Sequence, residues 1–320
     1  MISRRALVSR LGLLAAGGAA LYLLRDRLPW PAPGVEFAGG ERTPWIPMPG
    51  RGGLIELPAE AAGVPLRVVV DSGAEFSAID RSLAQRLELP QPVALPMLAY
   101  GVSGEPSLTH TVRFDLALPG LTVRGMRAAV LDIAGLSAAT GRDFQILLGR
   151  DVLRELVVEA DFPRRRTAFH RRGTYARPHD AIAVPVTLQG GAPMTPVRIE
   201  GAAPLRVMVD TGATGVLALS AEAARTAGLL APGREVRRAH SVSLGGVSLD
   251  QMVRARTVEA AGVTLRDVDV QVYAPSVRGP IPPGLLGTGF LERFRMVLDL
   301  AAAGLFLVPP GPTLVREPRL

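Results

Sequence analysis

The sequence predicts an all-β protein built from two similar lobes, and two observations support this prediction. Its hydrophobic segments are short and rich in β-branched residues, and the chain repeats itself. The 320 residues are 48% hydrophobic and include 35 Gly and 28 Pro. Such a composition allows a sizeable core and favours many turns and short elements over long helices.

The repeat consists of four blocks that recur in the same order. PLRVVVDSGA and PLRVMVDTGA differ at two positions, and their aspartates, Asp71 and Asp210, are 139 residues apart. The other paired blocks are 146–156 with 284–294, 157–169 with 296–307, and 120–132 with 262–273. A duplicated unit of about 140 residues is too long for a solenoid repeat. It predicts two lobes related by a pseudo-twofold axis.

Strands are expected wherever short apolar or alternating runs end at turn residues. These runs cover residues 66–70, 112–118, 121–131, 155–162, 181–188, 196–201, 205–209, 263–273 and 295–300. FPRRRT (162–167) and LAAAG (300–304) occupy equivalent places and are expected to be hairpin turns. Arg164–Arg166 would then be solvated; the alternative is a patch that binds anions or a membrane surface. Residues 80–89 and 220–230 are expected to form helices that cover the strands bearing the aspartates.

The N-terminus has the pattern of an export signal. Basic residues precede an apolar run from Leu11 to Leu24, and Arg25 follows it. This 14-residue run is shorter than the roughly 20 residues that cross a bilayer comfortably, although an uncleaved anchor stays open beside a signal peptide. SRRAL partly resembles a twin-arginine signal, and the other alternative is a buried N-terminal helix.

The domain boundaries follow from this pattern and from the repeat. They are a signal or anchor at 1–34, a Pro/Gly-rich tether at 35–50, lobes at 51–177 and 178–312, and a tail at 313–320. The expected location is the periplasm or the extracytoplasmic face of a bacterial inner membrane, where residues 11–24 would provide the anchor if they are retained.

Composition also disfavours several classes of function. The chain has no Cys, which excludes disulfides and thiolate metal sites. Its four histidines, His110, His170, His179 and His240, lack the spacing of metal ligands, so neither a metal nor a cofactor is expected. The net charge is +7, but the arginines are scattered rather than interleaved with aromatic residues. Nucleic-acid binding is therefore disfavoured.

The two Asp-containing turns carry a resemblance to a known family. Asp71-Ser72-Gly73-Ala74 and Asp210-Thr211-Gly212-Ala213 each follow an apolar strand, and each is followed by an apolar-apolar-Gly element. This pattern resembles the aspartic proteases of the pepsin and retropepsin kind, over roughly residues 50–310. LLGRDVL (147–153) is especially close to the retroviral pattern. LLGTGFL in the second lobe lacks the Arg150-Asp151 pair, so a salt bridge made by that pair would have no counterpart.

The resemblance implies a bilobal fold of two β-barrel-like lobes, each with a short helix, and a role for each residue of the turns. Asp71 and Asp210 would meet at the pseudo-twofold axis, share one proton and activate a water that hydrolyses a peptide bond. The Ser72 and Thr211 hydroxyls would lock the turns together. The other implied residues are glycines that allow close approach, Gly73 and Gly212, and glycines in the strands behind the dyad, Gly149 and Gly287.

Two further features bear on activity. Ala74 and Ala213 carry no hydroxyl that would stabilise a charged carboxylate, which predicts activity near neutral pH. Glycine-bearing hairpins at 99–106 and 240–248 are candidates for flaps over the substrate, with ordinary surface hairpins as the alternative. The candidate flap residues are Tyr100, Gly101, Gly104, Gly245 and Gly246.

The sequence therefore predicts an exported aspartic endopeptidase that acts on a protein or peptide substrate. A monomer is expected, because the duplication supplies both halves of the site. Two alternatives remain at this point. One is a catalytically silent, protease-like binding module. The other is a nucleotide-binding protein of the actin-like fold, because DTGATG also resembles the phosphate loop of that fold.

Overall fold

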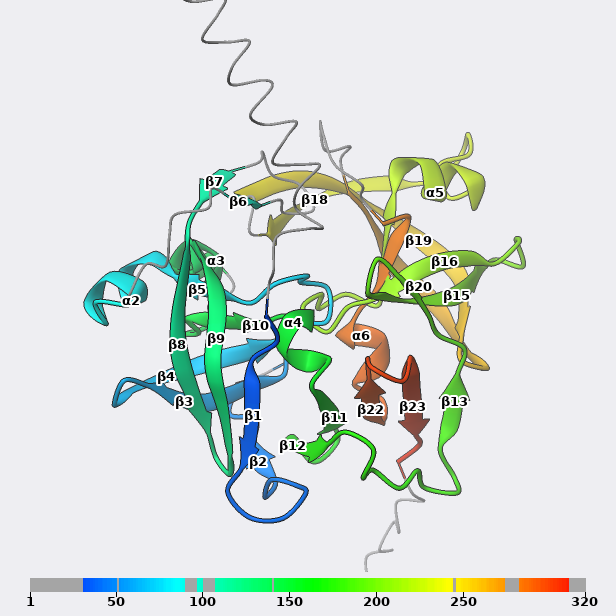
Figure 1. Ribbon diagram of the computed structural model, residues 1–320. Coiled ribbons are helices and arrows are strands. Elements are labelled where there is room, and N and C mark those ends of the chain that lie inside the picture. Colours follow the sequence, from blue (N-terminus) through cyan, green and yellow to red (C-terminus); the bar gives the residue numbers. More distant parts are fainter. Residues whose placement is uncertain are drawn as a thin grey trace, which may run out of the picture. The chain divides into compact units, whose positions relative to one another are not determined.

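A computed structural model describes residues 31–50, 52–89, 97–99, 107–139, 141–243, 246–273 and 282–310 (Figure 1). The chain divides into two units, Met1–Ala32 and Pro33–Leu320. All the strands and helices that the structure describes belong to the second unit. None of these helices has the length and apolar character needed to cross a bilayer.

The first lobe is built around a closed ring of six strands. The sheet runs in the order β1-β9-β5-β10-β4-β3-β8, and β8 also pairs with β9 to close the ring (Figure 1). The ring strands are β3 (Glu56–Ala61), β4 (Val64–Val70), β5 (Ala78–Asp80), β8 (Thr111–Leu118), β9 (Leu121–Leu131) and β10 (Ile146–Leu148). A separate hairpin consists of β6 (Met97–Ala99) and β7 (Ser107–Thr109).

The second lobe repeats this ring, with β15 pairing with β19 to close it. Its ring strands are β15 (Ala192–Ile199), β16 (Leu205–Val209), β17 (Leu217–Ser220), β19 (Gly246–Ala260), β20 (Val263–Tyr273) and β21 (Gly284–Leu286). β14 (Thr187–Gln189) and β18 (Val236–Ser243) extend the sheet at its two edges. Most of the buried apolar side chains of the two rings belong to one core cluster, and two smaller clusters hold others. The predicted all-β fold of two homologous lobes is confirmed.

Short helices cover or terminate ring strands in both lobes. α2 (Arg81–Arg86) and α5 (Ala221–Thr226) are the two predicted helices, and the side chains of Asp80 and Ser220 cap their N-termini. Three helices were not predicted. α3 (Ile133–Ala139) occurs in the first lobe, and α4 (Arg150–Leu153) and α6 (Thr288–Leu291) occupy equivalent places in the two lobes.

A third sheet joins the lobes, in the order β13-β23-β22-β11-β12-β2. Its strands are β2 (Ile46–Pro47), β11 (Leu156–Asp161), β12 (Arg166–Arg171), β13 (Ile182–Val184), β22 (Arg295–Asp299) and β23 (Gly304–Val308). Central strands β11 and β22 are antiparallel, and Glu159 lies opposite Val297. These two residues are 138 positions apart, so each is the other's equivalent in the repeat. The local twofold axis therefore passes between them, and both predicted hairpin turns are confirmed beside it.

The segment predicted as a tether is part of the fold. β1 (Gly34–Phe37) pairs with β9, and β2 pairs with β12. Ile46 and Met48 are buried in the core. Its Pro and Gly residues suggested a solvated linker, but its two strands pair with residues 84 to 121 positions later in the sequence. The folded unit therefore begins before residue 35, and not at residue 51.

The predicted strand at 181–188 is wrong as a single element. Residues before Pro185 form β13, which joins the sheet between the lobes, and residues after it form β14, which joins the second-lobe ring. Proline has no amide hydrogen to donate and fixes its own backbone angle, so the chain leaves one sheet and enters another at this point.

Candidate active site

Each aspartate of the repeat stands at the carboxyl end of a central strand. Asp71 follows β4, and its amide donates to the Leu148 carbonyl at 2.9 Å. Asp210 follows β16, and its amide donates to the Leu286 carbonyl at 3.0 Å. Since β4 runs parallel to β10 and β16 runs parallel to β21, the two lobes present their aspartates in the same way.

The turn after each aspartate holds its carboxylate in place. Oδ1 of Asp71 accepts hydrogen bonds from the amides of Gly73 and Ala74, at 2.9 and 3.0 Å. Oδ1 of Asp210 accepts equivalent bonds from the two residues at the matching positions of its own turn, at 2.8 and 3.2 Å. One oxygen of each carboxylate is thus fixed by the backbone.

Ser72 and Thr211 join the two turns across the lobe boundary. The amide of Ser72 donates to Oγ1 of Thr211 at 2.9 Å, and the amide of Thr211 donates to Oγ of Ser72 at 3.1 Å. Each hydroxyl also donates to a carbonyl of the opposite lobe, Ser72 to Val209 at 2.8 Å and Thr211 to Val70 at 2.7 Å. Both side chains are fully buried. The lock implied by the family resemblance is confirmed.

The two carboxylates meet, as the repeat predicts. A Cβ atom added to Gly73 would lie 2.6 Å from Cγ of Asp210, and one added to Gly212 would lie 2.6 Å from Cγ of Asp71. No side chain fits at either position. The carboxyl groups of Asp71 and Asp210 are close enough to share a hydrogen bond when one of them is protonated.

Burial and the closeness of the two negative charges change the pKa values of the pair. Burial raises the pKa of Asp210 to about 7, and the negative charge of Asp71 adds to the effect. Burial also raises the pKa of Asp71, but the amides of Ala74 and Gly73 and the hydrogen bond from Asp210 oppose this rise. Both pKa values are raised above the ordinary range of an aspartate, so the pair tends to hold a proton between the two carboxyl groups.

Gly149 and Gly287 were expected within the strands behind the turns, but they lie directly after these strands. Each is the N-cap residue of a short helix, α4 or α6. A Cβ atom at Gly149 would lie 2.5 Å from the carbonyl carbon of Phe76, and one at Gly287 would lie 2.3 Å from the Gly215 carbonyl oxygen. Their role is close backbone packing against the loops that continue from the Asp turns.

Arg150 is a site residue whose role the sequence did not reveal. Its Nη1 donates to the carbonyls of Ser72 and Gly73 at 3.0 and 2.7 Å, from beneath the Asp71 turn. The neighbouring Asp151 accepts from the amide and hydroxyl of Ser77, at 2.9 and 2.8 Å. The sequence feature that could have pointed to this role was the Arg150-Asp151 pair, which is present in the first lobe and missing from the second.

Most of the candidate flap residues lie outside the described residues. This applies to Tyr100, Gly101, Gly104 and Gly245. β6 and β7, which flank the first three, pair as a hairpin, and Gly246 pairs with Ser243 at the end of the β18–β19 hairpin. Hairpins are therefore present at both predicted places, and their action as flaps stays a prediction.

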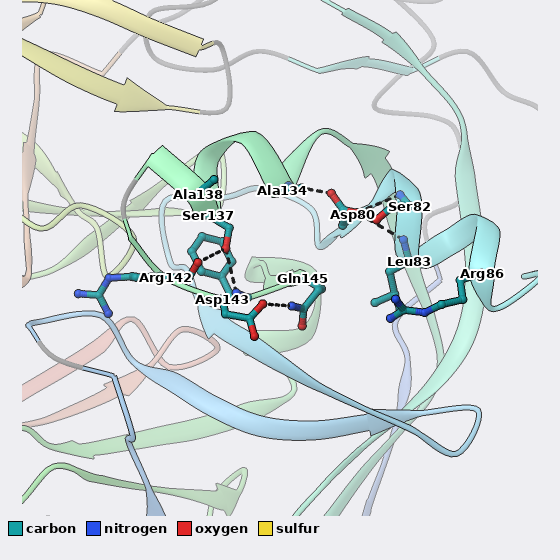
Figure 2. Close-up of a pocket in the computed structure, with 11 residues that line it drawn as sticks. Asp80, Ser82, Leu83, Arg86, Ala134, Ser137, Ala138, Arg142, Asp143 and Gln145 are labelled. Carbon is teal, nitrogen blue, oxygen red and sulfur yellow. Dashed lines mark hydrogen bonds between the residues drawn. The ribbon is translucent and has the colours of Figure 1, made fainter.

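A separate cavity of about 290 Å³ lies in the first lobe and does not include either aspartate of the pair (Figure 2). Asp80 lines it from the start of α2. One Asp80 oxygen accepts from Ser82 and Leu83, and the other accepts from the amides of Ile133 and Ala134. This carboxylate is saturated by bonds that connect α2 to α3, which is a structural role. Within the described part of the chain, no group of three or more His, Asp or Glu is placed to hold a metal ion.

A family model described as aspartyl protease matches the chain twice, over residues 57–152 and 195–290. The chain belongs to the aspartyl protease family. A search of curated proteins found no match. Each aspartyl protease segment contains one Asp turn and the Gly element behind it. The actin-like alternative is therefore wrong, and the described helices, of four to seven residues, are also too short for it.

Proposed function

We propose that this aspartyl protease family member is an active endopeptidase that hydrolyses peptide bonds with a water activated by Asp71 and Asp210. The observation that supports this most directly is the meeting of two buried carboxyl groups, one from each lobe, each against the Asp turn of the other lobe. Asp71 is half-buried rather than sealed, so a small molecule can reach the pair. A purely structural carboxylate pair at a lobe boundary would gain nothing from this exposure.

The proposed chemistry assigns a different role to each carboxyl group. Asp71, which is ionised, accepts a proton from the attacking water. Asp210, which is protonated, donates a hydrogen bond to the peptide carbonyl oxygen as negative charge develops there. The proton taken up by Asp71 then moves to the leaving amine nitrogen, and the C–N bond breaks. The backbone amides of each turn keep the carboxylates aligned throughout.

The protonation of the pair sets the pH range of this activity. Catalysis requires Asp210 to keep its proton, so kcat/KM should fall as pH rises through the Asp210 pKa of about 7. It should also fall at acid pH, where Asp71 becomes protonated. Activity in weakly acidic to neutral solution is expected, as the alanines at 74 and 213 predict. A pH optimum far below 5 would contradict this proposal.

The test uses the full-length protein and a shortened chain that begins at Pro33, assayed on a mixed peptide library between pH 4 and 8. Asp71→Asn and Asp210→Asn should each lower peptide cleavage by about a thousandfold or more, because each removes an acid–base group. Asp132→Asn is a matched control, since the exposed Asp132 accepts a bond from Gly135 that an asparagine oxygen also accepts.

Cleavage that survives both substitutions would overturn the proposed dyad. A folded protein that cleaves nothing at any pH, yet still binds peptides after both substitutions, would support the silent binding module instead. We further propose that the chain is exported, acts as a monomer on protein or peptide substrates, and is held at the membrane if residues 11–24 are retained. Cell fractionation and N-terminal sequencing of the mature protein test the location.

A further inference from the structure

Arg150 places a positive charge beneath one catalytic turn. It is the first residue of α4, and only 5% of its surface is exposed. Its Nη1 bonds to the carbonyls of Ser72 and Gly73, at 3.0 and 2.7 Å. A guanidinium is always charged in proteins, and burying it is costly unless nearby groups compensate its charge.

The peptide groups that Arg150 contacts are the same ones that hold Asp71. The Ser72 carbonyl shares its peptide group with the Gly73 amide, and the Gly73 carbonyl shares its peptide group with the Ala74 amide. Both of these amides donate to Oδ1 of Asp71. A cation bonded to the carbonyl end of a peptide polarises it and makes its N–H a stronger donor. Arg150 thus acts on Asp71 through both of its backbone donors.

The second lobe has the same backbone arrangement without the charge. The amide of Arg150 donates to the Ala74 carbonyl at 2.9 Å, and the amide of Thr288 donates to the equivalent Ala213 carbonyl at 2.8 Å. Oγ1 of Thr288 adds a second bond to Ala213, at 2.9 Å. The Ala213 carbonyl belongs to the peptide group beyond the two that donate to Asp210, so Thr288 does not polarise the Asp210 donors.

Both aspartates of the pair act on the charge of Arg150, Asp71 more strongly than Asp210. Glu75, in the loop of Asp71, also attracts the guanidinium, and Arg154, which directly follows α4, repels it. Asp151, the next residue of α4, is held by Ser77. Among the described residues, Nε of Arg150 has no hydrogen-bond partner. The compensating negative charge is therefore supplied largely by the catalytic loop itself.

We propose that Arg150 is a positioning residue that makes the catalytic pair asymmetric, by holding the negative charge on Asp71 and leaving the proton on Asp210. This rests on the proposed function in one respect only, namely that the asymmetry assigns the roles of base and acid. The asymmetry itself is a property of the resting protein. It exists because Arg150 at the start of α4 corresponds to the uncharged Thr288 at the start of α6.

The first test is the carboxyl titration of the full-length protein by NMR, with ¹³Cγ-labelled aspartate. The signals of Asp71 and Asp210 are assigned from their loss in Asp71→Asn and Asp210→Asn. On raising the pH, Asp71 should ionise first and Asp210 should ionise near neutrality. Ionisation of Asp210 before Asp71 would overturn the proposal. This measurement requires no peptide cleavage, so it stands even if the proposed activity fails.

The second test compares Arg150→Gln with Arg150→Lys. The glutamine retains a donor but loses the charge, and should move the first ionisation of the pair, and the acid limb of kcat/KM where cleavage is measurable, upward by about one pH unit. The lysine should restore most of this shift. Thr288→Val, the matched control in the second lobe, should leave the first ionisation unchanged. An unchanged titration in a folded Arg150→Gln protein would overturn the proposal.

Discussion

The two lobes share a backbone and differ in their charges. The two lobes repeat the strand order, the Asp turns, the capped helices and the hydrogen bond from α4 or α6 to the turn. They differ at the first residue of that short helix, which is Arg150 in the first lobe and Thr288 in the second. A second difference has the same character. Glu56, buried in the first lobe, pairs with Arg67 at 2.6 Å and Arg142 at 3.5 Å, and the equivalent residue of the second lobe is the buried Met194.

These differences show where a duplicated protein of this family is free to diverge. The groups that meet at the axis are constrained by each other, so the turns remain alike. The residues behind the turns do not have to match one another in this way, and they have diverged in charge. A symmetric pair of carboxylates has no preferred site for its single proton, whereas a pair with a cation on one side has one. Substitutions at equivalent positions of the two lobes measure how much each part of this symmetry matters for activity and stability.

The largest effect is expected where symmetry is strictest, at Gly73 and Gly212. An alanine methyl group at either position would lie 2.6 Å from the carboxyl carbon of the opposite aspartate, closer than such atoms approach. Gly73→Ala and Gly212→Ala should therefore each lower kcat/KM by at least about a hundredfold, because a misplacement of about 1 Å is enough to do so. Steady-state kinetics on a cleaved peptide measure the loss.

The matched control for these variants is Gly215→Ala. Gly215 lies in the same loop as Gly212, its backbone angle is not in the left-handed region, and an added Cβ would meet nothing within 4 Å. It should keep near-normal activity. If Gly73→Ala is as active as Gly215→Ala, the carboxylates are not in contact with the opposite turns.

The next effect concerns stability, at Ser72 and Thr211. Ser72→Ala and Thr211→Val each remove a hydroxyl that accepts one buried bond and donates another across the lobe boundary. Each should lower the free energy of unfolding by about 2–4 kcal/mol, since buried groups of the opposite lobe lose their partners. Urea denaturation measures the loss, and the double variant should lose less than the sum of the two. Full additivity would mean that the two hydroxyls act independently.

The sequence alone predicted this central region because the repeat carries the information. Two copies of one turn, in register with two copies of the Gly element, imply that Asp71 and Asp210 meet, whatever the surrounding structure. The same logic would have predicted the pairing of β11 with β22, since equivalent strands at a twofold axis lie side by side. Each strand alone shows only a local apolar pattern, so neither strand by itself indicates this pairing.

What the sequence did not reveal lies where the lobes are not equivalent. Ile46 pairs with Thr167 on β12, over a separation that no local pattern records, and the Pro- and Gly-rich context of Ile46 suggested a tether. The role of Arg150 was hidden for a related reason. An arginine beside an aspartate suggests a salt bridge, but Arg150 bonds to backbone carbonyls and Asp151 bonds to Ser77. Only the folded turn shows that these carbonyls share their peptide groups with the two amides that donate hydrogen bonds to Asp71.

A smaller effect is expected at the hairpin turn of each ring. Ala62 and Glu200 are equivalent, and both adopt a positive φ, of 49° and 47°. Only Glu200 is bonded to arginines, Arg234 at 2.9 Å and Arg256 at 2.9 Å, and these bonds lower the pKa of Glu200 to about 2. A lowered folded-state pKa contributes stability above the unfolded pKa, and the contribution is lost as pH falls toward 2.

Glu200→Gln should therefore lower the free energy of unfolding by about 1–2 kcal/mol at pH 7, and by much less near pH 2. Denaturant titrations at several pH values measure this dependence. Glu60→Gln, in the equivalent hairpin of the first lobe, is the control and should change stability little at any pH, because the side chain of Glu60 is exposed. A Glu200→Gln deficit that is the same at pH 2 and pH 7 would show that the charge of Glu200 is not what stabilises the turn.

The smallest effect is expected at the ends of α2 and α5. Both helices end in the same pattern, in which the amide of Leu89 or Leu229 bonds back to the carbonyl of Ala84 or Ala224. This pattern requires a left-handed residue just before the leucine. The second lobe has a glycine there, Gly228, with φ of 72°, whereas the first lobe has Glu88 with φ of 47°.

Glu88→Gly should raise the free energy of unfolding by about 0.5 kcal/mol. Glycine removes about 1–2 kcal/mol of steric cost in the left-handed region, and its greater freedom in the unfolded chain takes back part of that gain. Glu88→Ala separates this backbone effect from the loss of the charge, because it removes the carboxylate without relieving the backbone and should give no gain. Gly228→Ala should lower stability by about 1 kcal/mol. Equal gains from Glu88→Gly and Glu88→Ala would mean that the side chain of Glu88, and not the symmetry of the helix ends, is the source of the difference.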